Sequence, residues 1–131
     1  MPRESARQKA ERLIKELERE TAKFGSDMWL RKYAYDVDPY DGIEIPYTES
    51  ENAAIVNCHS IVVGLTELGE PAVGALRDAY TYGSSHMKRY VVDAVGGIYR
   101  KGNLEARKLL EDIASTASDE TLRKQAEQYL G

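Results

Sequence analysis

Apolar residues recur at intervals of three and four along most of this chain, which is the spacing that places side chains on one face of an α-helix. In the first segment, residues 5–24, the apolar positions are Ala6, Ala10, Leu13, Leu17 and Phe24. Ser5 and Gln8 form an S-x-x-Q capping box at its start, and Gly25 is a stop signal at its end. We expect this amphipathic helix to pack on the rest of the chain, because it is shorter than the three or four heptads that indicate a coiled coil.

The same spacing predicts five further helices, which are separated by glycine, proline, serine and aspartate. Their expected ranges are 50–68, 71–82, 86–100, 104–116 and 119–130. Ser118 or Asp119 is expected to cap the last of them. Alternation of β-branched residues occurs only around Ile43 and Ile45. The predicted fold class is therefore all-α, with five or six helices.

Residues 25–49 interrupt this pattern with an aromatic segment. It contains the only tryptophan of the chain and four of its nine tyrosines: Trp29, Tyr33, Tyr35, Tyr40 and Tyr47. Asp27 is a candidate cap for a short helix that would end near Tyr35. A connection of this length inside a compact domain is usually functional or disordered, and its aromatic content argues against disorder. Two interpretations stay open, a structural cap at the end of the helical stack and direct contact with a partner.

Two stretches of the second half, residues 69–96 and 102–131, form a degenerate repeat. Their first halves match at an offset of 33 through Gly69, Leu76 and Tyr80 against Gly102, Leu109 and Ile113. Their second halves match at an offset of 35 through Met87, Lys88, Arg89, Val91, Val95 and Gly96 against Leu122, Arg123, Lys124, Ala126, Leu130 and Gly131. A period of this length indicates stacked units that bury apolar faces against one another. The side chains expected in that core are Leu76, Val91, Val95, Leu109 and Leu130.

The repeat resembles HEAT-like repeats of the phycobilisome-lyase type. The resemblance rests on a glycine–acid–proline opening, a hydrophobic–basic pair and a small–Leu–Gly ending. The matching residues are Gly69-Glu70-Pro71-Ala72, Met87-Lys88, Leu122-Arg123, Ala94-Val95-Gly96 and Tyr129-Leu130-Gly131. It implies a short α-solenoid of about five to six helices, whose second helices line a concave, protein-binding surface.

On this interpretation residues 1–131 form one HEAT-like domain. It comprises an N-terminal helix (1–24), the aromatic insertion (25–49) and the repeat core (50–131). Two enzymatic relatives of this class fit poorly. The paired His-Glu dipeptides of the iron hydroxylases are absent, because Ser60 follows His59 and Met87 follows His86. The DNA glycosylases have a basic channel, whereas this chain has a net charge of −4.

The composition of the chain excludes some classes of function and location. An acidic chain argues against binding to nucleic acid. The charged N-terminus lacks the apolar core of a signal peptide, and no apolar run approaches the length of a membrane span. A single cysteine, Cys58, excludes an intrachain disulfide, so we expect a cytoplasmic protein that does not act on membranes. The sequence leaves the oligomeric state open.

The repeat register places three basic-type residues, His59, Arg89 and Lys124, at one position of successive second helices. Lys88 and Arg123 are next to two of them in sequence. Such a row would receive an extended acidic partner. The alternative is a solvated face, on which the cations pair with Asp93, Glu120 or Glu127.

The other candidates for chemistry have simpler explanations. Asp36, Asp38 and Asp41 resemble a calcium loop, but Pro39 lies inside it and the spacing is off by one residue. We expect Cys58 to be a core residue, and Gly96-Gly97 to allow close helix packing.

We therefore expect a non-catalytic protein-binding or adaptor module, with no metal or cofactor. Its expected partner-binding residues are His59, Lys88, Arg89, Arg123, Lys124, Trp29, Tyr33 and Tyr40. The alternative is an enzyme or a cofactor-handling accessory protein, such as a tetrapyrrole lyase-like protein. That function would require a deep pocket between the insertion and the concave face.

Overall fold

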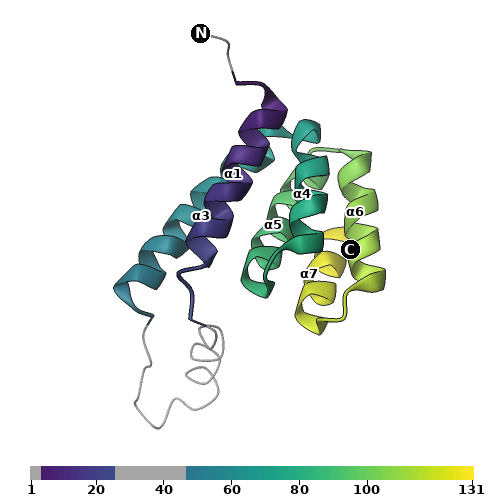
Figure 1. The fold of residues 1–131 in the computed structure, drawn as a ribbon. Helices are drawn as coiled ribbons and strands as arrows, with labels where there is room; N and C mark the ends of the chain where they lie inside the picture. The colour runs from purple at the N-terminus through teal and green to yellow at the C-terminus, as the bar shows by residue number, and fades with distance from the viewer. Residues whose placement is uncertain (1–3, 26–46) are drawn as a thin grey trace.

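The computed structural model describes residues 4–25 and 47–131, and these residues form six α-helices (Figure 1). The helices are α1 (Ala6–Thr21), α3 (Glu49–Leu68), α4 (Glu70–Tyr82), α5 (Ser85–Arg100), α6 (Leu104–Thr116) and α7 (Glu120–Leu130). None of the described residues forms a β-strand. The all-α prediction is thus confirmed, and the helices expected between residues 50 and 130 start or end within one residue of their predicted bounds.

Local side-chain caps explain most of the helix starts. Ser5 and Gln8 form the predicted reciprocal capping box on α1. Asp119, and not Ser118, caps α7, since its carboxylate accepts hydrogen bonds from the backbone N–H groups of Thr121 and Leu122. The remaining side-chain caps are Thr48 on α3, Ser84 on α5 and Asn103 on α6.

Helix α1 ends about one turn earlier than predicted. Its last residue is Thr21, and the backbone N–H groups of Lys23 and Phe24 donate to the carbonyls of Glu20 and Thr21. These tighter hydrogen bonds between residues three apart close the last turn before Gly25 is reached. Phe24 is still buried, so the predicted apolar stripe continues beyond the helix itself.

The helices lie in two layers, with α1, α4 and α6 in front of α3, α5 and α7 (Figure 1). Consecutive helices pair across the layers as α1 with α3, α4 with α5, and α6 with α7. Neighbours within each layer also pack together, and α5 contacts all five of the other described helices. The core is consequently continuous from the first pair to the last.

Four of the five predicted core residues, Leu76, Val91, Val95 and Leu109, are buried. The fifth prediction is wrong, because Leu130 is only half-buried. It is the last residue of the last helix, where neighbouring side chains cover it incompletely. Ala6, which was assigned to the apolar stripe of α1, is exposed in the first turn of that helix.

Two adjacent glycines let the neighbours of α5 approach closely, as the sequence predicted. A Cβ atom on Gly96 would lie 2.4 Å from ring carbons of Tyr129 on α7. A Cβ atom on Gly97 would lie 2.8 Å from a methyl carbon of Thr66 on α3. Both distances are shorter than packed carbon atoms allow, so α5 can contact α3 and α7 this closely only where it lacks side chains.

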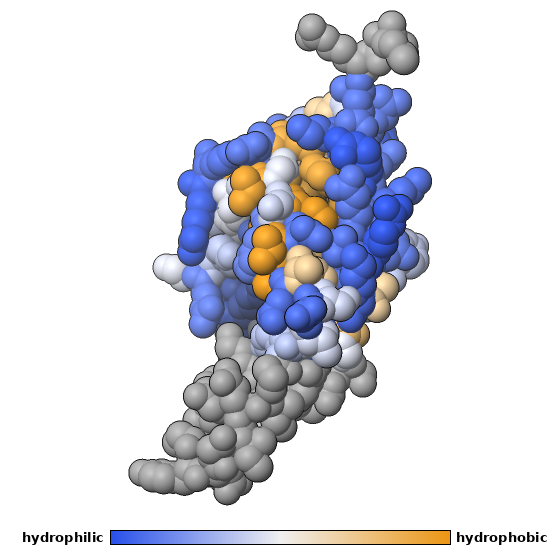
Figure 2. Space-filling view, turned by 90° about the vertical axis from the view of Figure 1, so that its left-hand side faces the viewer, coloured by the Kyte–Doolittle hydropathy of each residue, from blue (hydrophilic) through white to orange (hydrophobic). Residues whose placement is uncertain are grey.

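The flank formed by α1 and α3 carries an exposed apolar strip. Val56 and Val63 of α3 are 64% and 56% exposed, and a separation of seven residues places them on one helix face. Figure 2 shows apolar side chains gathered at the centre of this flank, with polar ones around them. No helix in the described part of the chain combines the length and apolar character that crossing a membrane requires.

Candidate functional site

A groove of about 540 Å³ crosses the second layer of helices. Each of three helices contributes side chains to it: Ile55 and His59 from α3, Arg89 and Asp93 from α5, and Lys124 and Gln125 from α7. The structure therefore brings together the three residues, His59, Arg89 and Lys124, that the repeat register placed in one row. We refer to this hollow as the second-helix groove.

The two neighbouring cations of the predicted row lie elsewhere. Lys88 and Arg123 are both half-buried, and neither lines the second-helix groove. The ammonium of Lys88 lies 5.2 Å from the ring centroid of Tyr80 on α4. Adjacent residues on a helix point about 100° apart, so a residue next to a groove-lining one faces a different neighbour.

Hydrogen bonds between α5 and α7 fix the floor of the second-helix groove. The side-chain amide of Gln125 donates to the Asp93 carboxylate at 2.8 Å and to the Arg89 backbone carbonyl at 2.9 Å. The Tyr129 hydroxyl donates to the same oxygen of Asp93 at 3.0 Å. Burial, together with the nearby Asp93 charge, raises the pKa of Tyr129 to about 12, so this hydroxyl keeps its proton at neutral pH.

The predicted alternative, in which acidic neighbours pair with the cations, holds for Lys124. The Lys124 ammonium lies 3.2 Å from the Glu120 carboxylate, and both side chains are about two-thirds exposed. Such an exposed pair contributes roughly 0–1 kcal/mol, so an incoming carboxylate can replace Glu120 at little cost. Asp93, by contrast, receives its hydrogen bonds from Gln125 and Tyr129.

Aromatic rings connect this groove with the opposite face of the molecule. His59 contacts Tyr90 edge-on, with ring centroids 6.0 Å apart, and Tyr90 lies 6.1 Å from Phe24. Phe24 in turn contacts His86 edge-on at 5.4 Å. Burial lowers the pKa of His86 below its ordinary value, since desolvation disfavours the imidazolium.

Glu51 is a buried carboxylate that the sequence analysis did not single out. It accepts hydrogen bonds from the backbone N–H of Gly25 at 2.9 Å and of Thr48 at 2.8 Å. Glu51 thereby binds both Gly25 and Thr48. Most of the aromatic insertion lies between these two residues in the sequence. The T-x-x-E spacing of Thr48 and Glu51 is a capping-box signal that identifies half of this arrangement. The contact with Gly25 joins residues far apart in sequence and has no local signal.

The predicted role of Cys58 as a core residue is confirmed. Its side chain is completely buried, and burial raises the pKa of the thiol to about 12. The nucleophilic thiolate is therefore negligible at neutral pH. Three of the predicted binding residues, Trp29, Tyr33 and Tyr40, and the acidic turn of Asp36, Asp38 and Asp41 lie outside the described residues.

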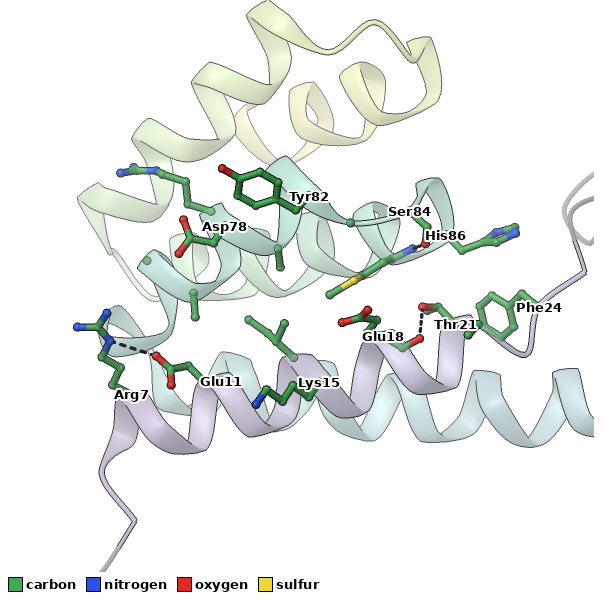
Figure 3. A pocket seen from close by; sticks show the side chains of 18 of the residues that line it. Arg7, Glu11, Lys15, Glu18, Thr21, Phe24, Asp78, Tyr82, Ser84 and His86 are labelled. Atoms are coloured by element: carbon green, nitrogen blue, oxygen red, sulfur yellow. Dashed lines mark hydrogen bonds and ion pairs between the residues drawn. The ribbon is translucent and has the colours of Figure 1, made fainter.

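A larger groove, of about 1110 Å³, runs between α1 and α4 on the first layer. Ile14, Ala75, Ala79 and Met87 supply apolar side chains to it, while charged residues of both helices line its edges (Figure 3). We call it the α1–α4 groove. The sequence analysis missed it, because a helical stripe of small residues on α4 looks the same whether another helix covers it or solvent does.

Comparison of the chain with protein-family models, with curated proteins and with solved structures finds no match. Within residues 4–25 and 47–131, no three His, Cys, Asp or Glu side chains gather where they could hold a metal ion. What the site does must therefore be inferred from its shape and charge. Both grooves are open surfaces that combine apolar and charged side chains.

Proposed function

We propose that this chain is a non-catalytic protein-binding module, built as a short α-solenoid of HEAT-like helical hairpins. Three consecutive helix pairs, each in contact with the next, support the proposal. The repeat offset supports it independently, since equivalent residues of successive units line one groove. Solenoids of this kind bind extended partners along the face that their second helices form.

The binding surface in this proposal is the second-helix groove, and its partner is an extended acidic segment of another protein. The observation that carries it is the meeting of His59, Arg89 and Lys124, one from each of three successive second helices, in one groove. Packed helices are about 8–10 Å apart, and a partner in polyproline II conformation advances about 3.1 Å per residue with three residues per turn, so that every third side chain points the same way. Carboxylates at every third residue of the partner would then face successive helices of the groove.

An acidic peptide tests this directly. The probe is a fluorescently labelled peptide with glutamate at every third position, and its match carries glutamine there. Fluorescence anisotropy at low ionic strength should show binding of the glutamate peptide alone. Added salt should weaken it, because charges are screened over about 10 Å at 0.1 M ionic strength.

The decisive variant is the double reversal Arg89→Glu with Lys124→Glu, which should abolish binding of the glutamate peptide. Its matched control is Arg107→Glu with Lys108→Glu, which changes the net charge equally on the exposed face of α6. If both doubles weaken binding to the same extent, overall charge explains the result and the groove is not the site.

The aromatic insertion is the second surface that we propose for recognition, through Trp29, Tyr33 and Tyr40. Aromatic side chains of this type dominate many protein interfaces. Replacing Trp29 and Tyr40 by alanine should reduce capture of a verified native partner while the far-UV circular dichroism stays unchanged. A loss of helicity in this variant would instead assign the insertion a capping role.

A further inference from the structure

The α1–α4 groove lies on the layer opposite the second-helix groove and has no role in the function proposed above. Figure 3 shows Glu11, Lys15 and Glu18 along its α1 side, with Asp78 and Tyr82 along its α4 side. Tyr82 is 87% exposed, the most exposed large apolar side chain in the described part of the protein. A protruding aromatic ring beside an apolar hollow is a feature of binding surfaces.

Gly74 lines this groove. It lies inside α4, where glycine costs about 1 kcal/mol relative to alanine. A Cβ atom there would meet nothing within 4 Å, in contrast to Gly96 and Gly97, whose neighbours require glycine. Packing inside this chain therefore does not explain Gly74. A surface glycine of this kind lets atoms from outside approach the helix backbone.

The charges of the groove are balanced, although the chain as a whole is acidic. Its lining contains three bases, Arg7, Lys15 and Arg77, and three acids, Glu11, Glu18 and Asp78. Arg77 and Asp78 are adjacent and exposed, and neither forms an ion pair with another described residue. An interface between two identical copies must be complementary to itself, which requires both signs of charge in one patch.

We propose that the α1–α4 groove is the interface of a symmetric dimer, in which it receives α4 of a second copy of this chain. The two α4 helices run antiparallel, with the two-fold axis between Arg77 and Asp78. Residues at equal distances from the axis then face each other. Tyr82 then lies within one residue of Gly74 of the other copy, about 1.5 Å along the helix, and its ring covers the space over that glycine. The same register places Arg77 of each copy beside Asp78 of the other.

The ring of Tyr82 and the space over Gly74 are the knob and the hole of this interface. The apolar side chains of Ile14 and Ala75 line the same hollow and would remove the ring from water. The two Arg77–Asp78 pairs lie beside the two-fold axis, where they select this register over alternatives that bring like charges together.

A charge-swap experiment tests the register. Arg77→Asp leaves two adjacent acids on α4, and Asp78→Arg leaves two adjacent bases, so each variant alone repels its own copy and should be monomeric in sedimentation velocity. A mixture of the two variants should associate into a heterodimer, and the double variant R77D/D78R should regain self-association. If the mixture sediments as monomers at concentrations where the wild type is dimeric, the proposed register is wrong.

Two substitutions test the contact between the Tyr82 ring and the space over Gly74. Gly74→Leu places a side chain in this space, where a Cβ atom meets nothing within 4 Å, and Tyr82→Ala removes the ring. Each should raise the dimer dissociation constant by about tenfold or more, as expected for loss of a central aromatic anchor. The matched control is Leu104→Ala, which truncates another exposed apolar side chain, 68% exposed, at the start of α6. It should leave the dissociation constant unchanged.

Two results would overturn the proposal. One is a wild-type protein that sediments as a monomer up to its solubility limit. The other is a dimer that Gly74→Leu leaves intact and that replacement of Val56 and Val63 by serine dissociates, because the apolar strip of α3 would then be the interface. Unfolding curves of every variant, recorded in parallel, establish that a change in association does not come from loss of the fold.

Discussion

At the scale of single residues, two glycines illustrate how one residue type serves opposite purposes. Gly96 is covered by the Tyr129 ring, and Gly74 faces the open α1–α4 groove. Both lie within helices and both lower helix propensity to the same degree. What separates them is the neighbouring surface, which is a packed ring in one case and empty space in the other.

These glycines should respond in opposite ways to alanine. Gly96→Ala should lower the free energy of unfolding by about 1–3 kcal/mol, the usual cost of overpacking, because Tyr129 must move away. Gly74→Ala should raise it by about 0.4–1 kcal/mol, since the unfolded chain loses freedom and nothing clashes. Urea denaturation followed by circular dichroism measures both. Equal effects of the two substitutions would contradict the packing described for Gly96.

His86 should make stability depend on pH. Burial lowers its folded-state pKa below the ordinary value of 6.5, and the Arg89 charge lowers it further, while a hydrogen bond with the Gly25 backbone and the Glu51 charge oppose this. Below about pH 6.5 the unfolded chain therefore binds more protons at this site than the folded one, and stability falls as pH decreases. Above that pH both states are neutral and the effect disappears.

Comparison of the wild type with His86→Asn separates the contribution of His86 to the pH dependence of stability from that of the carboxylates. Between about pH 7.5 and pH 5.5, a range that spans the ordinary histidine pKa, the wild type should lose more stability than the variant. An NMR titration should give His86 a pKa below that of an unfolded histidine. A pKa above 6.5 would contradict the burial of this ring.

At the scale of elements, the helix starts are local events that short motifs specify. The boundary of α7 is an example, because Ser118 and Asp119 are both acceptable caps by residue type. In the fold, only Asp119 accepts the N–H groups of the first turn. The end of α1 shows the limit of such motifs: Gly25 is a valid stop signal, but the tighter turn at Lys23 and Phe24 ends the helix first.

The cap of α7 provides a test at this scale. Asp119→Ala should lower the free energy of unfolding by about 0.5–2 kcal/mol, because two N–H groups lose their acceptor. It also removes a negative charge that the helix N-terminus favours. The matched control Ser118→Ala should stay within about 0.5 kcal/mol of the wild type, as surface substitutions usually do. If Ser118→Ala had the larger effect, the cap of α7 would be Ser118 and not Asp119.

At the scale of the whole molecule, α5 holds the helices together. It contacts each of the other five described helices, and its contribution to the core includes Val91, Val92 and Val95, all fully buried. A linear array of repeats can unfold from its ends, because each unit contacts only its neighbours. Here a single helix contacts every other described helix, so its loss would expose core side chains of all of them.

Native-state hydrogen exchange should therefore find the slowest amides in α5. Their free energies of opening should equal the global free energy of unfolding, since α5 can separate from its neighbours only when the whole fold opens. Amides in α1 and α7, the outer helices, should exchange through smaller openings. Protection that peaks in α1 or α7 would show that these helices unfold independently of the central pair.

The sequence by itself determined the helices. Their bounds depend on caps, glycines and a period of 3.6 residues, all of which act between residues a few positions apart. The expected repeat offset placed His59, Arg89 and Lys124 in one row, and in the structure these three residues line one groove.

Only the tertiary structure decided which surfaces are covered and which stay open. The pairing of Asp93 with Tyr129, the contact of Glu51 with Gly25 and the turn of Lys88 toward Tyr80 all join residues on different elements. A helical stripe specifies which side chains share a face, but not which neighbour meets that face. The α1–α4 groove follows from this: its side chains form ordinary helical patterns, and it exists because two helices leave space between them that no other described element fills.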